Sequence, residues 1–235
     1  MSARVALVTG ASSGLAAGVA RSLAREGYRL AFTYRAGGTP PDETRTALRE
    51  FDPDALAVDN ALEDLPAAQR LVAAVGRARG PIDIVVHAVG PIVVRPFARS
   101  QWSDYVAMID GNLGSAVALA FAVLPSMRER RFGRLLFFGM NGSHVTQPAA
   151  SMALYGAAKA AVVTFARTLA LEEAANGISV NVIEPGDIRD KTATRAQAAA
   201  LPAGNPTGHS GSWEDIAAAV RFAVAEHRAR WACGR

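Results

Sequence analysis

An apolar run leads directly into a glycine-rich turn near the start of the chain, where residues 5–16 read VALVTGASSGLA. A strand is expected at Arg4–Thr9, because an apolar run without polar alternation is typical of a strand buried on both faces. Gly10 and Gly14 permit a tight turn and close backbone approach, and Ala16 lets the following helix pack on the strand. The free N–H groups at the start of such a helix can bind a phosphate. This stretch therefore predicts a phosphate-binding turn between a strand and a helix.

The alternation of apolar strand and longer helical segment continues along the chain. Strands are expected at Arg4–Thr9, Arg29–Tyr34, Ala55–Val58, Ile82–His87, Arg134–Phe138 and Ile178–Ile183. Helices are expected at Gly14–Glu26, Asp42–Glu50, Leu65–Arg77, Ser103–Arg130 and Tyr155–Asn176. Continuous apolar strands joined by crossover helices predict an α/β fold with a doubly wound parallel sheet. We find no internal repeat or linker, so residues 1–235 are expected to form one domain, with a ligand-side loop at about 186–211.

Composition excludes several classes of protein. Half of the 235 residues are hydrophobic and 20% are charged, which excludes a disordered chain, a collagen-like fibre and a coiled coil. The longest apolar stretch, Ala116–Leu124, is shorter than the roughly 20 residues of a membrane-spanning helix, so no membrane partner is expected. Met1–Arg4 leads straight into the first strand without a secretory leader, and we expect a cytoplasmic protein. A net charge of +4 without a basic, aromatic-interleaved run predicts no nucleic-acid partner. The single cysteine, Cys233, excludes an internal disulfide.

The end of the second expected strand indicates which dinucleotide would bind. An NAD-binding unit would place Asp or Glu about 20 residues after the turn, where it binds the ribose 2′-hydroxyl. No acidic residue lies between Glu26 and Asp42, and the position reads Tyr34-Arg35. A guanidinium is suited to a 2′-phosphate, so the inferred cofactor is NADP(H). The alternative is an arginine that is merely solvated at a strand end.

Tyr155 and Lys159 stand four residues apart at the start of the helix after the fifth strand. Side chains at this spacing share one helix face. A neighbouring cation lowers the pKa of a phenol, so Tyr155 is expected to exchange a proton with a substrate oxygen near neutral pH. The alternative is a pair of residues on a solvated helix surface.

Together these residues resemble the short-chain dehydrogenase/reductase family, in particular proteins similar to 3-oxoacyl-ACP reductase, over nearly the whole chain. The resemblance implies a Rossmann fold and an NADP(H)-dependent oxidoreductase, with no metal site. The cofactor-binding residues that it implies are Gly10, Ser12, Ser13, Gly14, Leu15, Tyr34, Arg35, Asp59, Asn60, Gly90, Tyr155, Lys159, Pro185, Gly186 and Ile188. The catalytic residues that it implies are Asn112, Ser143, Tyr155 and Lys159. Residues 212–217 resemble the start of the family's last helix.

The mechanism that the resemblance implies is hydride transfer from the nicotinamide to a carbonyl carbon, or the reverse oxidation of an alcohol. Tyr155 would protonate the carbonyl oxygen, Lys159 would acidify Tyr155 and hold the ribose, and Asn112 would position a relay water. The small-molecule substrate would be a carbonyl compound or an alcohol, such as a 3-oxoacyl thioester.

Two segments depart from the family pattern. The usual Asn-Asn-Ala-Gly is replaced by His87-Ala88-Val89-Gly90, and we interpret His87 as a satisfied strand-end histidine. The expected catalytic serine is displaced: counting back from Tyr155 reaches Gly142, whereas counting forward from Gly133 reaches Met140. We therefore assign the role to Ser143, while Asn141 and His144 remain alternatives. Ser143 could instead simply cap a turn.

The chain after His227 is short for the family's seventh strand. Residues 228–235 lack an apolar alternation, so we expect six strands with the seventh short or missing. The exposed sheet edge would need cover from the tail or from a partner subunit. The family is commonly tetrameric, and a homo-oligomer, dimeric or tetrameric, is expected.

Two other functions remain open at this stage. The altered serine region and Gln147-Pro148 resemble pteridine reductases of the same family, which reduce a C=N bond. The displaced serine is also compatible with a nucleotide-binding protein without turnover. The charged residues at the start of the 186–211 loop, which are Asp187, Arg189, Asp190 and Lys191, fit either an acidic-substrate site or a solvated loop.

Overall fold

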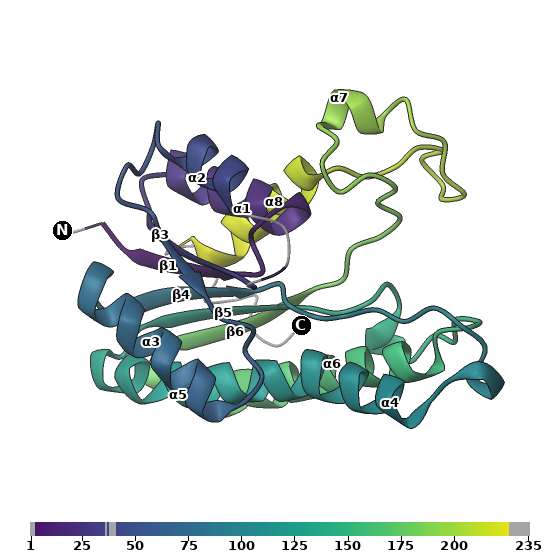
Figure 1. Cartoon of the computed structure of the whole chain (residues 1–235), viewed down its shortest axis with the longest axis horizontal. Coiled ribbons are helices and arrows are strands. Elements are labelled where there is room, and N and C mark those ends of the chain that lie inside the picture. The colour runs from purple at the N-terminus through teal and green to yellow at the C-terminus, as the bar shows by residue number, and fades with distance from the viewer. Residues whose placement is uncertain (1–2, 36, 38–40, 226–235) are drawn as a thin grey trace.

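The computed structural model describes residues 3–35, 37 and 41–225, and it contains one six-stranded parallel sheet (Figure 1). The strands are β1 (Val5–Thr9), β2 (Arg29–Tyr34), β3 (Leu56–Asp59), β4 (Ile82–His87), β5 (Gly133–Phe138) and β6 (Ile178–Ile183). Their order is β3-β2-β1-β4-β5-β6. The chain builds outward from β1 to β3 and then crosses to β4 on the other side of β1. This confirms the predicted doubly wound Rossmann fold.

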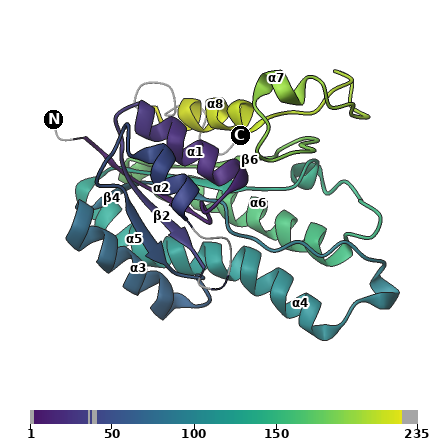
Figure 2. The same ribbon diagram turned by 45° about the horizontal axis from the view of Figure 1, so that its top comes forward.

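Helices cover both faces of the sheet. They are α1 (Gly14–Arg25), α2 (Asp42–Leu48), α3 (Leu65–Arg79), α4 (Trp102–Met108), α5 (Ser115–Arg130), α6 (Ala153–Glu173), α7 (Arg195–Ala198) and α8 (Trp213–Val224). Helices α3, α5 and α6 lie below the sheet in Figure 1, whereas α1, α2 and α8 lie above it. Helix α1 packs beside α8 in both views (Figure 2).

The strands are mostly apolar because each face of the sheet has its own hydrophobic core. In β1, Ala6 and Val8 pack with α1 and α8, while Val5 and Leu7 pack with α3 and α5. Successive strand residues point to opposite faces, so a strand covered on both sides needs apolar residues at every position. This arrangement leaves the carboxyl ends of the strands for polar function.

One predicted helix is interrupted. The expected helix Ser103–Arg130 consists of α4, one π-helical turn at Ile109–Gly114, and α5. Gly111 packs so closely on Pro91 that an added Cβ would lie 2.5 Å from Pro91 Cδ. The turn buries Asn112 and aims its amide at the loop after β4, because Asn112 Nδ2 donates to the carbonyl oxygens of Pro91 (3.1 Å) and Met108 (3.0 Å). Turns of this kind frequently occur at functional sites.

Several element boundaries differ from the sequence prediction by a residue or two. Strand β3 includes Asp59, and α6 begins at Ala153, before Tyr155. Helix α7 is a single turn inside the 186–211 loop that the sequence analysis did not predict. The described part of the sheet has six strands, as expected, whereas residues 226–235, where a shortened seventh strand was considered, lie outside the described residues.

Two helical stretches, Trp102–Arg130 and Ala153–Asn176, are long and apolar enough to cross a bilayer by length and composition alone. The sequence analysis considered only uninterrupted apolar runs and therefore did not identify them. Both pack one face against the sheet, and core helices of soluble proteins meet the same criterion. They are weak evidence for a membrane protein.

Candidate active site

The glycine-rich turn has the strand-to-helix form that the sequence predicted. Gly10 and Gly14 adopt φ values of +68° and +63°, which favour glycine. Gly10 N donates to Thr33 Oγ1 (2.9 Å), which ties the turn to β2. Ser13 stands at the N-cap of α1 in extended conformation, and no side chain caps the helix. The first N–H groups of α1 therefore remain available to an anion.

A cleft of about 740 Å³ runs from this turn along the ends of β2 and β4. Six of the predicted cofactor residues line it: Gly10, Ser12, Tyr34, Arg35, Asn60 and Gly90. The side chain of Asn60 forms hydrogen bonds with the residues that follow it in the chain, since Nδ2 donates to Ala67 O and Oδ1 accepts from Leu62 N. Asp59 ends β3, opposite Tyr34 in the strand register. The remaining predicted cofactor residues lie outside the lining of this cleft.

Asn112 and Lys159 converge on Gly90. A Cβ at Gly90 would collide with Asn112 Oδ1 and would lie 3.3 Å from Lys159 Nζ. The ammonium donates to Phe138 O (2.9 Å), while Asn112 Oδ1 is buried and accepts no hydrogen bond from the described residues. A buried acceptor without a partner is costly. Asn112 and Lys159, both of which are proposed to take part in proton transfer, are therefore adjacent. Asn112 Oδ1 can still accept a hydrogen bond from a further donor.

Tyr155 lies on the same face of α6 as Lys159, with 5.7 Å between Lys159 Nζ and the Tyr155 ring centroid. Burial raises the pKa of the Tyr155 phenol and lowers the pKa of Lys159 to about 8. The expectation that Lys159 acidifies Tyr155 is therefore wrong for the chain without cofactor, because desolvation raises the pKa of the phenol. A phenol that keeps its proton is suited to act as an acid.

The displaced serine is folded back into its own loop. Ser143 is buried, its N donates to Met140 O (2.8 Å), and its Oγ accepts from Met140 N (2.9 Å). This is the turn-capping geometry that the sequence left as an alternative. Met140 itself lies beside α6, where an added Cβ at Gly156 would lie 3.6 Å from the Met140 methyl group.

The two other residues considered for the serine's role stand in the same loop. His144 Nδ1 lies 2.7 Å from Glu184 Oε2, which also accepts from Gly142 N (3.2 Å). No side-chain hydrogen bond is found for Asn141 among the described residues. Glu184 thus fixes this loop to the end of β6, a link that no local motif in the sequence indicated.

His87 connects the end of β1, before the glycine-rich turn, to the start of α5, next to the π-helical turn. Its Nδ1 lies 3.0 Å from Thr9 Oγ1, and its Nε2 lies 3.0 Å from Ser115 Oγ. Ser115 donates its single proton to Gly111 O (2.7 Å), so Nε2 must carry the proton toward Ser115. Burial first, and then the charge of Lys159, lower the pKa of His87 to about 3. His87 is therefore a neutral, satisfied histidine, as the sequence analysis interpreted it.

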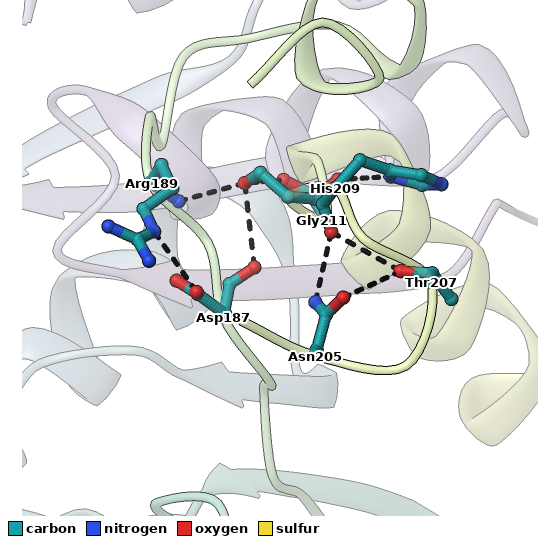
Figure 3. Close-up of polar contacts among 7 residues, drawn as sticks. Asp187, Arg189, Asn205, Thr207, His209 and Gly211 are labelled. Carbon is teal, nitrogen blue, oxygen red and sulfur yellow. Dashed lines mark hydrogen bonds and ion pairs between the residues drawn. The ribbon is translucent and has the colours of Figure 1, made fainter. Parts of the chain in front are cut away.

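The segment after β6 closes a loop over the carboxyl end of the sheet. Pro185 and Gly186 lead into it, and Ile188 packs against the core that contains α1 and α8. The two ends of this loop are joined, because Arg189 N donates to Ser210 Oγ (2.9 Å) and Gly211 N donates to Asp187 O (2.9 Å). Figure 3 shows Asp187 and Arg189 of one end beside Gly211 of the other. Asn205, Thr207 and His209 form a second cluster near its tip. The described residues contain no group of three or more His, Cys, Asp or Glu placed to hold a metal ion.

Known proteins are similar to this chain in sequence and in fold. A family model described as "short chain dehydrogenase" matches residues 4–200. The chain is 32% identical over 237 residues to "Putative oxidoreductase YtkK" of Bacillus subtilis (strain 168), a match that covers 95% of this chain and 90% of that protein. It is 31% identical over 231 residues to the 3-oxoacyl-[acyl-carrier-protein] reductase FabG of Haemophilus influenzae, covering 96% and 92% of the two chains.

A solved structure described as "putative 3-oxoacyl-reductase from bacillus thuringiensis" superposes with a TM-score of 0.89 at 28% identity, covering 99% of this chain and 94% of the other. A short-chain alcohol dehydrogenase structure from Sinorhizobium meliloti 1021, also described as "putative", gives a TM-score of 0.86 at 27% identity, covering 100% and 93%. From the family model over residues 4–200, these relatives and the shared fold, the chain belongs to the short-chain dehydrogenase family of NAD(P)-dependent oxidoreductases.

Proposed function

We propose that this enzyme uses NADP(H) to reduce a carbonyl group to an alcohol, with Tyr155 as the proton donor. The observation that carries the proposal is the convergence of Lys159 and Asn112 at Gly90, next to Tyr155 and beside the cleft that begins at the phosphate turn. The relatives described as 3-oxoacyl-[acyl-carrier-protein] reductases support a 3-oxoacyl thioester as the substrate class. We also propose a single-domain, cytoplasmic homo-oligomer.

The residues present fit the dinucleotide. Gly10 and Gly90 line the cleft, and the uncapped start of α1 offers N–H groups to the pyrophosphate. Ser12, Ser13, Gly14 and Leu15 would surround the phosphates, and Pro185, Gly186 and Ile188 would border the nicotinamide. Arg35 lines the cleft at the end of β2, where its guanidinium would bind a 2′-phosphate. Asp59 and Asn60 would contact the adenine side of the site.

When bound, a reduced nicotinamide supplies the hydride. Tyr155 holds its proton because burial raises its pKa, so it enters the reaction as a neutral acid. Lys159, still positively charged below a pKa of about 8, stabilises the phenolate that forms when Tyr155 gives up this proton. Asn112 Oδ1 would hold a water through which Tyr155 is reprotonated.

Ser143 is proposed as the donor to the substrate carbonyl oxygen. Its Oγ accepts the N–H of Met140, which leaves its own proton free to donate. Ser143→Ala should then lower kcat at least tenfold while the Kd for NADPH changes less than about threefold. Wild-type turnover by this variant would reject the assignment and favour the turn-capping role.

The proposal is tested by a substrate panel with purified enzyme and NADPH. The panel contains a 3-oxoacyl thioester, simple ketones and a dihydropterin, and each is measured with wild type, Tyr155→Phe and the matched variant Tyr105→Phe. We expect reduction of the 3-oxoacyl thioester, a loss of about 100-fold or more in Tyr155→Phe, and no change in Tyr105→Phe. Turnover of dihydropterin alone would favour C=N reduction, and NADPH binding without any turnover would favour a non-catalytic protein.

A further inference from the structure

Glu184 directly follows the last residue of β6 and carries a largely buried carboxylate, since only 15% of its side chain is exposed. An added Cβ at Gly139 would lie 2.8 Å from Glu184 Cγ and 3.2 Å from Glu184 Oε1. The glycine after β5 therefore leaves the space that this side chain fills. Oε1 is buried and has no hydrogen-bond partner among the described residues, so the polar contacts of the carboxylate are those of Oε2.

Glu184 Oε2 contacts the turn that carries Ser143 at two points. Gly142 N donates to it (3.2 Å), and His144 Nδ1 lies 2.7 Å from it. In the described part of the chain, the other hydrogen bonds of residues 140–147 join residues within that segment. Glu184 is therefore the side chain that ties this turn to the sheet.

Gly142 and Ser143 belong to one compact turn. Ser143 N donates to Met140 O (2.8 Å), and Ser143 Oγ accepts from Met140 N (2.9 Å). The single helical turn Ser143–Val145 packs against α6, the helix that carries Tyr155. Because these hydrogen bonds hold the turn as one unit, the position of Gly142 determines where the Ser143 hydroxyl lies.

A cavity of about 370 Å³ borders the contact between His144 and Glu184, and Arg167 on α6 also lines it. The turn is therefore not enclosed by packed side chains on this side. Its position depends on the two contacts of Glu184 Oε2. A displaced turn would leave a buried carboxylate without any partner, which is costly, and this cost holds the turn in place.

We infer that Glu184 is a positioning residue for carbonyl reduction, which places the Ser143 hydroxyl through Gly142 and His144. The inference rests on the proposed function and deepens it. Glu184 acts through the turn and not on the reacting atoms, so its removal should slow the chemical step and leave the NADPH site intact. A displacement of about 1 Å at a reacting group can lower a rate by about 100-fold.

The first test measures kcat, KM and the Kd for NADPH in wild type, Glu184→Ala, Glu184→Gln and Glu129→Ala. Glu184→Ala should lower kcat at least tenfold and change the Kd for NADPH less than about threefold. Glu184→Gln keeps an oxygen acceptor in the same place, so its kcat should stay within about threefold of wild type. Glu129→Ala removes an exposed carboxylate from α5 and should change none of these values.

The second test asks whether Glu184 acts through Ser143. The double variant Ser143→Ala/Glu184→Ala should be no slower than Ser143→Ala alone, because both substitutions remove the action of one hydroxyl. Amide hydrogen exchange at Gly142 should be at least about tenfold faster in Glu184→Ala than in wild type. Losses that multiply in the double variant, or unchanged exchange at Gly142, would overturn the inference.

The outcomes separate the inference from the proposed function. If wild type reduces the carbonyl substrate and Glu184→Ala does so with an unchanged kcat, the inference is wrong and the proposed function stands. If Glu184→Gln loses as much activity as Glu184→Ala, the negative charge is needed rather than an acceptor for the turn, and the inference is again wrong. If wild type binds NADPH but reduces no carbonyl compound, both are wrong.

Ser143→Ala by itself gives one further outcome. If this variant turns over as wild type does, Glu184 cannot act through Ser143, and the inference fails. The proposed reduction with Tyr155 as the proton donor would still stand.

Discussion

His87 is a single residue whose protonation state controls part of the pH dependence of stability. The unfolded chain protonates this histidine near pH 6.5, whereas the folded chain does so only near pH 3. Between these values the unfolded state binds more protons, so the free energy of unfolding falls as the pH falls through this window. From pH 7 to pH 5 the loss due to this one residue is about 2 kcal/mol.

Urea denaturation at pH 7 and pH 5 tests this prediction. His87→Asn should lose less stability between the two pH values than wild type does, by about 2 kcal/mol, although it is less stable at pH 7. His209→Asn, which changes an exposed histidine, should keep the wild-type difference. Equal losses in wild type and His87→Asn would show that His87 is not held neutral.

Lys159 should set the alkaline limit of carbonyl reduction. Its pKa is lowered to about 8, so the free enzyme loses this positive charge as the pH rises through that value. The phenolate that forms on Tyr155 is then no longer stabilised. We expect kcat/KM to fall about tenfold from pH 7 to pH 9, since this parameter follows the ionisation of the free enzyme. A flat profile over this range would contradict the assigned role.

Among the elements, the π-helical turn positions Asn112. The contact of this turn with the loop after β4 can be tested by a substitution that adds one methyl group. An added Cβ at Gly111 would lie 2.5 Å from Pro91, so Gly111→Ala must displace the turn or the loop. We expect a loss of about 1–3 kcal/mol in stability and a fall in activity of at least tenfold.

Gly76→Ala is the matched control, because Gly76 lies inside α3 with open space at its Cβ position. This substitution should stabilise the protein by about 0.5–1 kcal/mol and leave activity unchanged. Thermal melts and turnover of the three proteins check both statements. Normal activity in Gly111→Ala would show that the exact position of this turn is not needed.

The regular elements could be predicted from sequence because their signals are local. A strand covered on both faces must be apolar, and this alone places β1 to within one residue. The π-helical turn could not be read from periodicity, since it depends on the contact of Gly111 with Pro91. Gly111 and Gly114 were the only local signs of an interruption.

The candidate site likewise contains some features that a single segment determines and others that depend on contacts between distant segments. The glycine turn and the Tyr155-Lys159 pair follow from spacing along one segment. The capping of Met140 by Ser143 and the pairing of His144 with Glu184 depend on a loop that folds against distant elements. Sequence spacing gives neither the distance between Lys159 and the Tyr155 phenol nor the burial of that phenol, because both depend on the folded structure. For this reason the pKa of Tyr155 was predicted in the wrong direction.

For the whole molecule, the outward faces of two long helices fit the proposed self-association. Phe121 on α5 and Leu171 on α6 are 66% and 79% exposed. Large exposed apolar side chains are typical of contact surfaces between subunits. Light scattering at micromolar concentration should show a dimer or tetramer, and Phe121→Glu should weaken assembly about 100-fold, because a symmetric interface contains the substitution twice.

Leu65→Glu provides the control, since Leu65 is a partly exposed apolar residue at the start of α3. It should assemble as wild type does. A monomeric wild-type protein at micromolar concentration would contradict self-association, and unchanged assembly in Phe121→Glu would place the interface elsewhere.

The central claim is that a hydride passes to a carbonyl carbon while Tyr155 supplies the proton. A single-turnover reaction with NADPH deuterated at the reactive nicotinamide position tests it most directly, with the product analysed by mass spectrometry. We predict one deuterium on the new alcohol carbon in wild type, and the same label formed at least about 100-fold more slowly in Tyr155→Phe. A product without the label, or labelled product formed equally fast by both proteins, would contradict the account.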